Sequence, residues 1–305
     1  TVIGSETFEN CTSLTEIKLP DALTEIGSRA FKGCTALSNV DFPTNIKTIG
    51  TSAFSGTAIK KVIIPKSLDI IGSYAFNECK NLKTAIFEDS QKTIEVSELH
   101  SNMPPFGNCE LDSLYIGRPH GTKSSYSEEV YKSNVKHVVF GPLISLINNQ
   151  YISSNNNLES VDILNNNSVI TIDHESFKNC TTLKRIHSFA KTPPLCESNH
   201  TFPTEVYDSA VLTVPAGSKK AYRAAEVGKL FKNIQSEGGG FKVTVTCNSS
   251  LGEVALNGSN VAEITVDEDE PLTIAITPIE GYKVTKITVN GTDVTSSLVD
   301  NAIAY

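Results

Sequence analysis

Phenylalanine recurs at a nearly constant interval in the first third of the chain. Phe8, Phe31, Phe54 and Phe76 are separated by 23, 23 and 22 residues (31−8, 54−31 and 76−54). Each holds the same place in a segment of the type IGSRAFKGCTALSNVDFP (26–43), which opens with Ile-Gly and closes with an aliphatic run. A period of this length is typical of a solenoid, in which each repeat buries its apolar side chains only against its neighbours.

Later segments repeat the pattern less regularly. PPFGNCELDSLYIG (104–117) and IDHESFKNCTTLKRIHS (172–188) keep the phenylalanine, the cysteine and the aliphatic positions in order. INNQYISSNNNLESVDI (147–163) has lost the phenylalanine and the cysteine, and NVKHVVFG (134–141) and AVLTVPAG (210–217) add two strand-like segments. We therefore predict about nine coils, the later ones irregular in length.

One repeat combines a strand with a turn. In TEIKLP (15–20) the isoleucine and the leucine alternate with charged residues, which predicts a strand with one buried face that ends at the proline. We expect Gly27 to allow a tight bend, and Ser28 to cap a short helical turn that carries Phe31.

Four cysteines occupy a single position of the repeat. Cys11, Cys34, Cys79 and Cys180 share it, and Thr57 takes their place in the third copy, which favours a small, half-polar filler. Stacked residues lie about 4.8 Å apart and do not converge on one point, as the four ligands of zinc do. We predict buried free thiols. A disulfide between neighbouring coils, such as Cys11 with Cys34, stays open as the alternative for a secreted chain.

Composition and motifs narrow the function. The net charge is −8 over 305 residues, which disfavours nucleic-acid binding, and no apolar run approaches the ~18 residues of a spanning helix. The histidines form no HExxH spacing, and the chain has no GxSxG elbow, phosphate loop or paired-carboxylate pattern. The acids of 267–270 lack the spacing of a calcium loop and predict a charged hairpin turn. We therefore expect no enzyme, no metal and no cofactor.

The pattern changes after SEGGG (236–240), which has the composition of a flexible linker. Residues 241–305 alternate apolar and polar side chains and predict a small all-β domain. Asn257-Gly258 and Asn290-Gly291 are the strongest short signal of a hairpin turn.

The repeat consensus IGxxAFxxCxxLxxIxLP resembles the BspA-like leucine-rich repeats of Bacteroides-type surface proteins. Residues 190–235 resemble the terminal unit of such arrays, with Gly228 in the place of its usual tryptophan, so the unit is expected to pack less tightly. The block from Gly281 to Gly291 resembles a divergent internalin-type B-repeat. That family usually has a further strand beyond the position of Tyr305, which implies a truncated domain or a following module.

The resemblance implies the whole architecture. It predicts an α/β solenoid, mostly β with short helical turns, over residues 1–235, with a helical cap at about 190–235. A linker (236–240) and a small β domain (241–305) follow. It also implies a non-enzymatic binding or adhesion protein, monomeric, secreted or held on the cell surface as an outer-membrane lipoprotein, with a protein ligand on a host cell or matrix.

Alternation also predicts which side chains leave the core. A curved solenoid offers its outward strand positions as an extended binding surface, and the centre of this one is apolar with mixed charge around it, as in protein interfaces. Apolar residues that only favour strand formation would give the same pattern. Two other functions also stay open: a passive stalk, and a glycan-binding accessory of a surface enzyme system. The candidate partner-binding residues are Lys61, Ile63, Thr84, Ile86, Ser113, Tyr115, His137, Val139, Arg185 and His187.

Overall fold

The structure is a computed structural model that describes residues 1–97, 104–122, 134–148, 151–164, 169–238, 241–244, 252–261, 263–266, 271–286, 288–289, 292–293 and 302–304. It divides into two compact units, one of Thr1–Pro215 with Ala221–Ile234 and one of Ala216–Lys220 with Gln235–Tyr305. The linker was predicted at 236–240. Residues 239–240 lie outside the described part of the chain, so the predicted domain boundaries stay a prediction.

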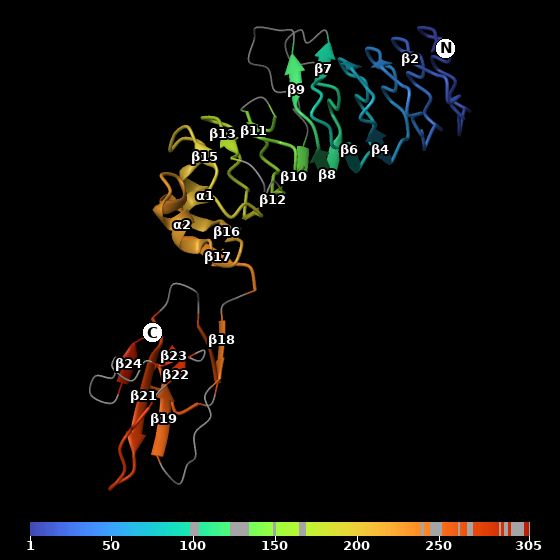
Figure 1. The fold of residues 1–305 in the computed structure, drawn as a ribbon. Helices are drawn as coiled ribbons and strands as arrows, with labels where there is room; N and C mark the ends of the chain where they lie inside the picture. The colour runs from blue at the N-terminus through green and yellow to red at the C-terminus, as the bar shows by residue number, and fades with distance from the viewer. Residues whose placement is uncertain are drawn as a thin grey trace. The chain divides into compact units, whose positions relative to one another are not determined.

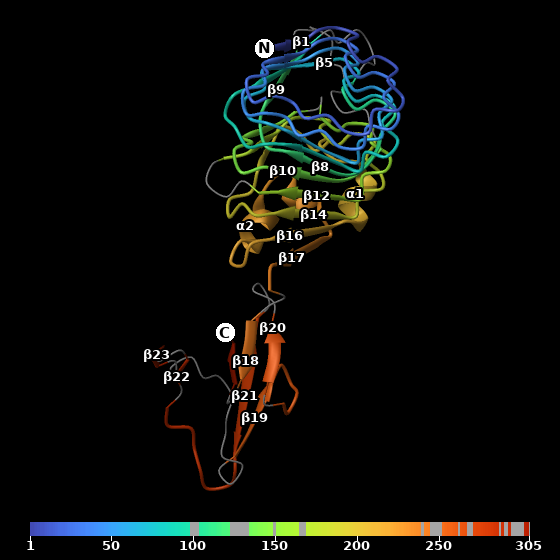
Figure 2. The ribbon, with the colours of Figure 1, turned by 90° about the vertical axis from the view of Figure 1, so that its right-hand side faces the viewer.

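The first unit is a β-solenoid of about nine coils, as the repeats predict. One side of the coils forms a large sheet, seen face-on in Figure 2, with the strand order β17-β16-β14-β12-β10-β8-β6-β4. Its strands are β4 (Lys61–Ile64), β6 (Thr84–Phe87), β8 (Glu110–Ile116), β10 (Asn134–Phe140), β12 (Ser160–Ile163), β14 (Arg185–Ser188), β16 (Val211–Val214) and β17 (Asn233–Ser236).

Two smaller sheets follow other sides of the coils. The first has the order β1-β2-β3-β5-β7-β9 and the second the order β11-β13-β15, and both are parallel (Figure 1). Their strands are β1 (Val2–Ile3), β2 (Glu25–Ile26), β3 (Thr48–Ile49), β5 (Ile70–Gly72), β7 (Ile94–Ser97), β9 (His120–Thr122), β11 (Leu146–Ile147), β13 (Thr171–Ile172) and β15 (Leu195–Cys196).

The large sheet begins only in the third coil. Residues 14–20 and 37–43 form no strand, so the strand predicted at 15–20 is wrong. The closest backbone bond between these segments joins the Ser38 amide to the Thr15 carbonyl over 3.4 Å.

Backbone amides alternate between two kinds of partner in the turn that carries each phenylalanine. In the second coil, the amides of Arg29, Phe31 and Gly33 donate to carbonyl groups of the third coil over 2.7 to 2.8 Å. The amides of the residues that follow them, at 30, 32 and 34, donate to the carbonyl group three residues earlier. Arg29 (φ 56°) and Gly33 (φ 75°) are left-handed, which a right-handed helix excludes. The short helical turn predicted after Ser28 is therefore wrong.

The glycines of three successive Ile-Gly pairs, Gly27, Gly50 and Gly72, lie against the backbone of the preceding coil. A β-carbon on Gly27 would lie 2.5 Å from the amide nitrogen of Ser5, and one on Gly50 would lie 2.6 Å from that of Ser28. Gly72 makes the same approach to the third coil. The tight bend predicted at Gly27 is thus not what requires glycine there; the close approach of two coils is.

A ladder of stacked phenylalanines fills the core. Phe8, Phe31, Phe54, Phe76 and Phe106 follow one another with ring-centroid distances of 5.1, 5.1, 5.3 and 5.4 Å and interplanar angles of 12° or less. The predicted repeat register is therefore confirmed through the fifth coil.

The cysteine position is a buried hydrogen-bond donor. The thiols of Cys34, Cys79 and Cys180 donate to carbonyl groups of the preceding coil over 3.1 to 3.3 Å, and all three are free. In the same position Thr57 donates its hydroxyl to the Phe54 carbonyl over 3.0 Å. The prediction of a small, half-polar filler is confirmed for these residues. Cys11, in the first coil, is free but exposed, so the prediction of a buried thiol is wrong at that position.

Three short helices lie in the region of the predicted cap. They are α1 (Thr204–Ser209), α2 (Lys219–Ala224) and the 3₁₀ helix η1 (Gly228–Leu230). The first contributes Val206 and Tyr207 to the core.

The second unit consists of antiparallel pairs. β18 (Phe241–Thr244) pairs with β20 (Glu263–Val266), β19 (Gly252–Leu256) pairs with β21 (Thr273–Pro278), β21 pairs with β24 (Ala302–Ala304), and β22 (Thr288–Val289) pairs with β23 (Thr292–Asp293).

The Asn-Gly turn at Asn257-Gly258 is present. Both residues have positive φ, and Leu256 and Ser259 exchange two bonds of 2.9 Å around them. The turn does not join β19 to β20 as a hairpin, because β19 pairs with β21 and β20 pairs with β18. Asn290-Gly291 and the acids of 267–270 lie outside the described residues.

Candidate functional site

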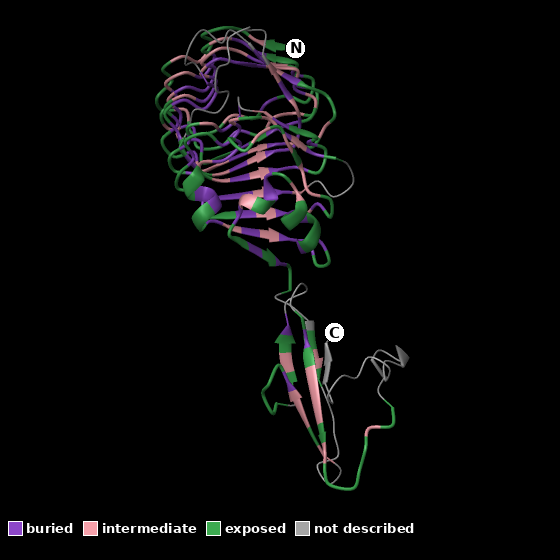
Figure 3. Ribbon diagram, turned by 90° about the vertical axis from the view of Figure 1, so that its left-hand side faces the viewer, coloured by how far each residue is buried: buried purple, intermediate pink, exposed green. Residues whose placement is uncertain are grey.

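The outward side chains of the large sheet line up in two columns. The parallel register places the strands residue on residue, and Figure 3 shows buried and more exposed positions alternating along them. The first column is Lys61, Thr84, Ser113, His137, Ser160, Arg185 and Val211, and the second is Ile63, Ile86, Tyr115, Val139, Asp162, His187 and Thr213. All ten residues predicted to bind a partner are in these columns; the binding itself stays a prediction.

The second column is apolar over four consecutive coils. Ile63 is 43% exposed, and Ile86, Tyr115 and Val139 are half-buried. An apolar row of this kind on the outside of a sheet is desolvated at little cost when another surface covers it. The column becomes polar at Asp162, which follows Val139 in the register.

Tyr115 is held in place by a neighbour. Its hydroxyl donates a hydrogen bond of 2.9 Å to Oδ1 of Asp89, in the loop after β6. Burial, and then the Asp89 carboxylate, raise the pKa of Tyr115 to about 12. The phenol therefore stays neutral at ordinary pH.

The polar end of the face contains a serine, a histidine and an aspartate in contact. Nδ1 of His137 lies 2.7 Å from Oγ of Ser160, and Nε2 lies 3.4 Å from Oδ2 of Asp162. Ser160 is 6% exposed and Asp162 is half-buried. Sequence reasoning placed these positions outward but did not link them; the register of β10 against β12 was the signal that could have done so.

These three groups do not have the arrangement of an acyl-transfer site. Such a site needs an accessible hydroxyl and a pair of N–H donors aimed at the developing oxyanion. Here the hydroxyl of Ser160 is covered by the His137 ring, and the adjacent amides belong to the parallel ladder of β10 and β12. The contacts instead fix His137 and Asp162 on the face.

His187 extends the face toward the last coils. Its ring lies 4.0 Å from the ring of Phe189, centroid to centroid, at an interplanar angle of 31°. Arg185, in the other column, is exposed. This end of the sheet therefore offers two tilted, adjacent rings beside a cation.

A buried arginine links segments of neighbouring coils, and no sequence signal indicated it. Arg118 is fully buried after β8, where Nε donates to the Lys92 carbonyl over 3.0 Å. Nη1 donates to the carbonyls of Lys66 over 3.1 Å and Pro65 over 3.4 Å. One side chain thus joins the ends of three segments of the coil.

His120 is also in the core. Its ring meets Phe87 edge-on at 4.7 Å and Tyr151 at 5.5 Å. Burial, and then the charge of Arg118, lower the pKa of His120 to about 3. A histidine that stays neutral in this setting has a structural role.

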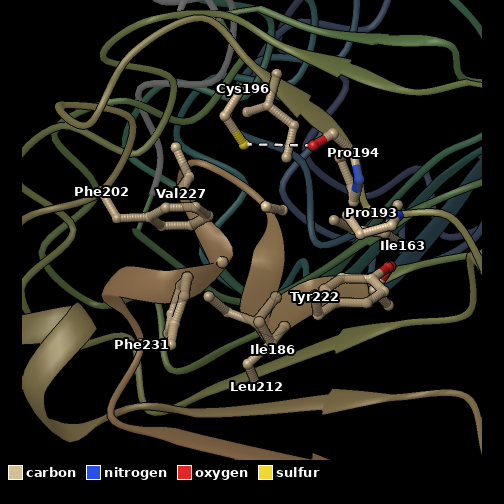
Figure 4. A pocket seen from close by; sticks show the side chains of 14 residues that line it. Ile163, Ile186, Pro193, Pro194, Cys196, Phe202, Leu212, Tyr222, Val227 and Phe231 are labelled. Atoms are coloured by element: carbon tan, nitrogen blue, oxygen red, sulfur yellow. Dashed lines mark hydrogen bonds between the residues drawn. The ribbon is translucent and has the colours of Figure 1, made fainter. Parts of the chain in front are cut away.

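One cavity lies among the last coils (Figure 4). Its volume is about 40 Å³, and its walls are apolar, with Phe202, Phe231 and the Cys196 thiol among them. The Tyr222 hydroxyl is already bonded to Ser188 and to the Ala190 carbonyl. Pockets for small molecules measure about 300–1,000 Å³, so this one is a packing gap.

The gap agrees with the looser packing expected where glycine replaces tryptophan. Gly228 lines it, and a β-carbon there would lie 2.0 Å from the Tyr222 carbonyl oxygen. A tryptophan therefore could not enter this position without a change in the backbone.

Among the described residues, no three side chains of histidine, cysteine, aspartate or glutamate gather as ligands of a metal ion would. No helix in the described segments is both long enough and apolar enough to cross a membrane.

Short parallel strands, a stacked phenylalanine core and an aligned outer face define a leucine-rich-repeat solenoid. The sequence matches the family described as BspA type leucine rich repeat region in six copies, over residues 1–116 and 102–193. The chain belongs to this family. The match stops at residue 193, so the resemblance of the second unit to a B-repeat stays a prediction.

Solved structures show distant similarity. A leucine-rich repeat protein of Bacteroides ovatus is 19% identical, over 77% of this chain and 76% of that one, with a TM-score of 0.31. The pneumococcal vaccine antigen PcpA is 14% identical, over 78% and 84%, with a TM-score of 0.33. A leucine rich cell surface protein of Faecalibacterium prausnitzii is 18% identical, over 78% and 69%, with a TM-score of 0.25. No curated protein matches the sequence.

Proposed function

We propose that the chain is a non-enzymatic surface protein that binds a protein of a host cell or matrix through the outward face of its large sheet. The main support is the apolar column of Ile63, Ile86, Tyr115 and Val139, which four consecutive strands hold in register. Protein interfaces combine such an apolar centre with a polar rim. Lys61 and His137, in the neighbouring column, belong to that rim.

Rigidity supports the same role. The Asp89 hydrogen bond fixes the Tyr115 ring, and the contacts of His137 with Ser160 and Asp162 fix the rim. A surface whose side chains are already ordered loses less entropy when it binds. Family membership agrees with a binding scaffold, and secretion or anchoring at the cell surface is part of the proposal.

The test is a binding measurement on the labelled chain. The probes are cultured epithelial cells and a solubilised basement-membrane extract. The paired substitution Ile86→Asp with Tyr115→Asp places charge at the centre of the face and should weaken binding at least about 30-fold, since central anchors contribute ~2 kcal/mol or more. The matched control is Leu195→Asp on β15, where the native leucine is 61% exposed.

Each other outcome points to a different function. Unchanged binding by the paired variant would reject this face. A native chain that binds no cell, extract or immobilised glycan would favour a passive stalk. Binding to a glycan that is lost in the paired variant would favour the glycan-binding accessory.

A further inference from the structure

Cys79 and Cys109 hold the same position in successive coils of the solenoid. The thiol of Cys79 donates to the Phe54 carbonyl over 3.2 Å, and the thiol of Cys109 donates to the Phe76 carbonyl over 3.1 Å. In both cases the acceptor lies three residues before the residue that holds this position in the preceding coil. The Cys109 thiol therefore follows the Cys79 thiol in the stack. Both side chains are buried and free.

Side chains in this position touch from one coil to the next. Oγ1 of Thr57 lies 3.3 Å from Sγ of Cys79, on the side of the preceding coil. On the side of the following coil, a hydrogen bond between the two thiols lowers the pKa of Cys79 and raises that of Cys109. The Cys79 amide and the Cys109 thiol also donate to the same carbonyl group, that of Phe76, over 3.4 and 3.1 Å. The two cysteines thus meet the first requirement of a disulfide, which is that the side chains already lie together.

The two cysteines bracket an irregular coil. Thirty residues separate Cys79 from Cys109 (109−79), whereas 22 separate Thr57 from Cys79 (79−57). The chain between the two cysteines contains β6 and β7, so a bond between the sulfurs would close this longer coil into a ring. A crosslink stabilises a chain more as the loop that it closes becomes longer.

Other cysteines of the same position lack such a neighbour. Cys34 precedes Thr57, and Cys180 follows Asn155, whose Nδ2 donates to the Val135 carbonyl over 3.0 Å. Within the described part of the chain, Cys79 and Cys109 are therefore the one case in which two buried thiols follow each other in this stack.

We propose that Cys79 and Cys109 form a disulfide when the chain folds in an oxidising compartment, and that this bond closes the irregular coil between them. The oxidant is a low-molecular-weight disulfide. One cysteine thiolate attacks it, forms a mixed disulfide and releases one small thiol. The other cysteine thiolate then attacks the protein sulfur of the mixed disulfide and releases the second small thiol.

The reaction is balanced without a further reagent. The two protein thiols give up two protons and two electrons, and the small disulfide takes them up as it becomes two thiols. Both sulfur atoms are buried in the finished coil, so the exchange takes place before the coil closes. The inference goes beyond the proposed function, because it does not depend on what binds to the outer face.

Refolding in a glutathione buffer tests the bond. The full chain is unfolded in urea with dithiothreitol, freed of this reductant, and refolded in a mixture of reduced and oxidised glutathione. Free thiols are then alkylated in urea, and the chain is digested with trypsin. Trypsin cuts after Lys80 and Lys92, between the two cysteines, so the disulfide would join peptides 67–80 and 93–123. Mass spectrometry detects the joined pair, and Cys180 is the internal control, which should be alkylated.

Two results are expected. The joined pair should account for most of the peptide that contains Cys79. The oxidised chain should also unfold in urea with an equilibrium constant at least about 30-fold smaller than that of the same chain kept in dithiothreitol. Alkylation of both cysteines, glutathione retained on either of them, or a bond to other cysteines in place of this one would overturn the proposed disulfide. Equal stability of the two chains would overturn the closing role given to it.

Discussion

The hydroxyl of Tyr115 donates to Oδ1 of Asp89 over 2.9 Å, across two neighbouring coils. The same oxygen lies 2.7 Å from the place of a β-carbon on Gly117 and 2.5 Å from that of one on Gly141. Glycine at both positions therefore leaves room for the carboxylate. The Tyr115 ring, at the centre of the proposed face, is therefore held by a carboxylate in the loop that follows the neighbouring strand.

Asp89→Asn should lower the pKa of Tyr115 from about 12. The substitution removes a negative charge that disfavours the phenolate, while burial, the larger cause, remains, so the pKa should not reach its ordinary value. An ultraviolet titration of phenolate absorbance, compared with a Tyr115→Phe background, measures the change. Asp112→Asn, on the first column's side of β8, is the control and should leave the pKa of Tyr115 in place.

Gly50→Ala should destabilise the solenoid, because its β-carbon would lie 2.6 Å from the Ser28 amide nitrogen. Overpacking of this kind costs about 1–3 kcal/mol. Gly4 has the same place in the first coil, and there the nearest atom to an added β-carbon is Oγ1 of Thr7, at 3.4 Å. Gly4→Ala should change the free energy of unfolding by less than ~0.5 kcal/mol. Urea unfolding, followed by circular dichroism, compares the stability of the two variants. Equal losses of stability would contradict the conclusion that the close approach of two coils requires glycine.

Arg118→Met should destabilise the chain strongly. It leaves the carbonyls of Lys92, Lys66 and Pro65 without the guanidinium that binds them. Loss of several charge-assisted bonds inside the core costs about 3 kcal/mol or more. Arg185→Met removes an exposed arginine from β14 and is the matched control, with an expected change under ~0.5 kcal/mol. Thermal and urea unfolding measure the stability of both variants. A similar loss of stability in the two would contradict the structural role given to Arg118.

Stability should fall as the solution is acidified from about pH 6.5 toward 3. The pKa of His120 is lowered to about 3 in the folded chain, whereas an unfolded histidine titrates near pH 6.5. Between these two pH values the folded state therefore binds fewer protons than the unfolded state. The contribution of neutral His120 to the free energy of unfolding is complete above about pH 6.5 and is lost as the pH falls toward 3. His120→Phe removes the group but keeps a ring between Phe87 and Tyr151.

The measurement is urea unfolding of both chains at pH 7 and pH 4. The variant should lose less stability than the native chain between the two. Carboxylates titrate identically in both chains, so the difference between the chains isolates His120. An equal loss would mean that His120 is solvated or already charged.

The repeating part of the fold could be predicted from the spacing of a few residue types. The interval between phenylalanines fixed the coils, and the alternation around Ile63 and Ile86 fixed which side chains face outward. These features repeat, and each copy supports the interpretation of the next. The proposed binding residues followed from the same alternation of inward and outward side chains along each strand.

The features that sequence reasoning missed depend on single, non-repeating contacts. Arg118 and His120 occur in one coil only, and nothing in their local sequence distinguishes a buried guanidinium from a surface one. The turn after Ser28 was mistaken for a helix because its amides bond to the next coil, which no local pattern shows. The contact of His137 with Ser160 joins residues 23 positions apart.

The alternation of amides in the phenylalanine turns restricts where such a chain can change its length. We call the turn from residue 29 to residue 34, and its equivalent in each coil, the arc. One residue added between Arg29 and Gly33 would swap the amides that bond to the neighbouring coil with the amides that close the turn. Every later amide of the arc would then lose its acceptor. Extra residues are tolerated elsewhere: the step from Phe76 to Phe106 is 30 residues (106−76), and the surplus precedes the arc at Phe106. Members of this family should therefore differ by inserted loops at the margins of the coil, while the arcs stay uniform in length.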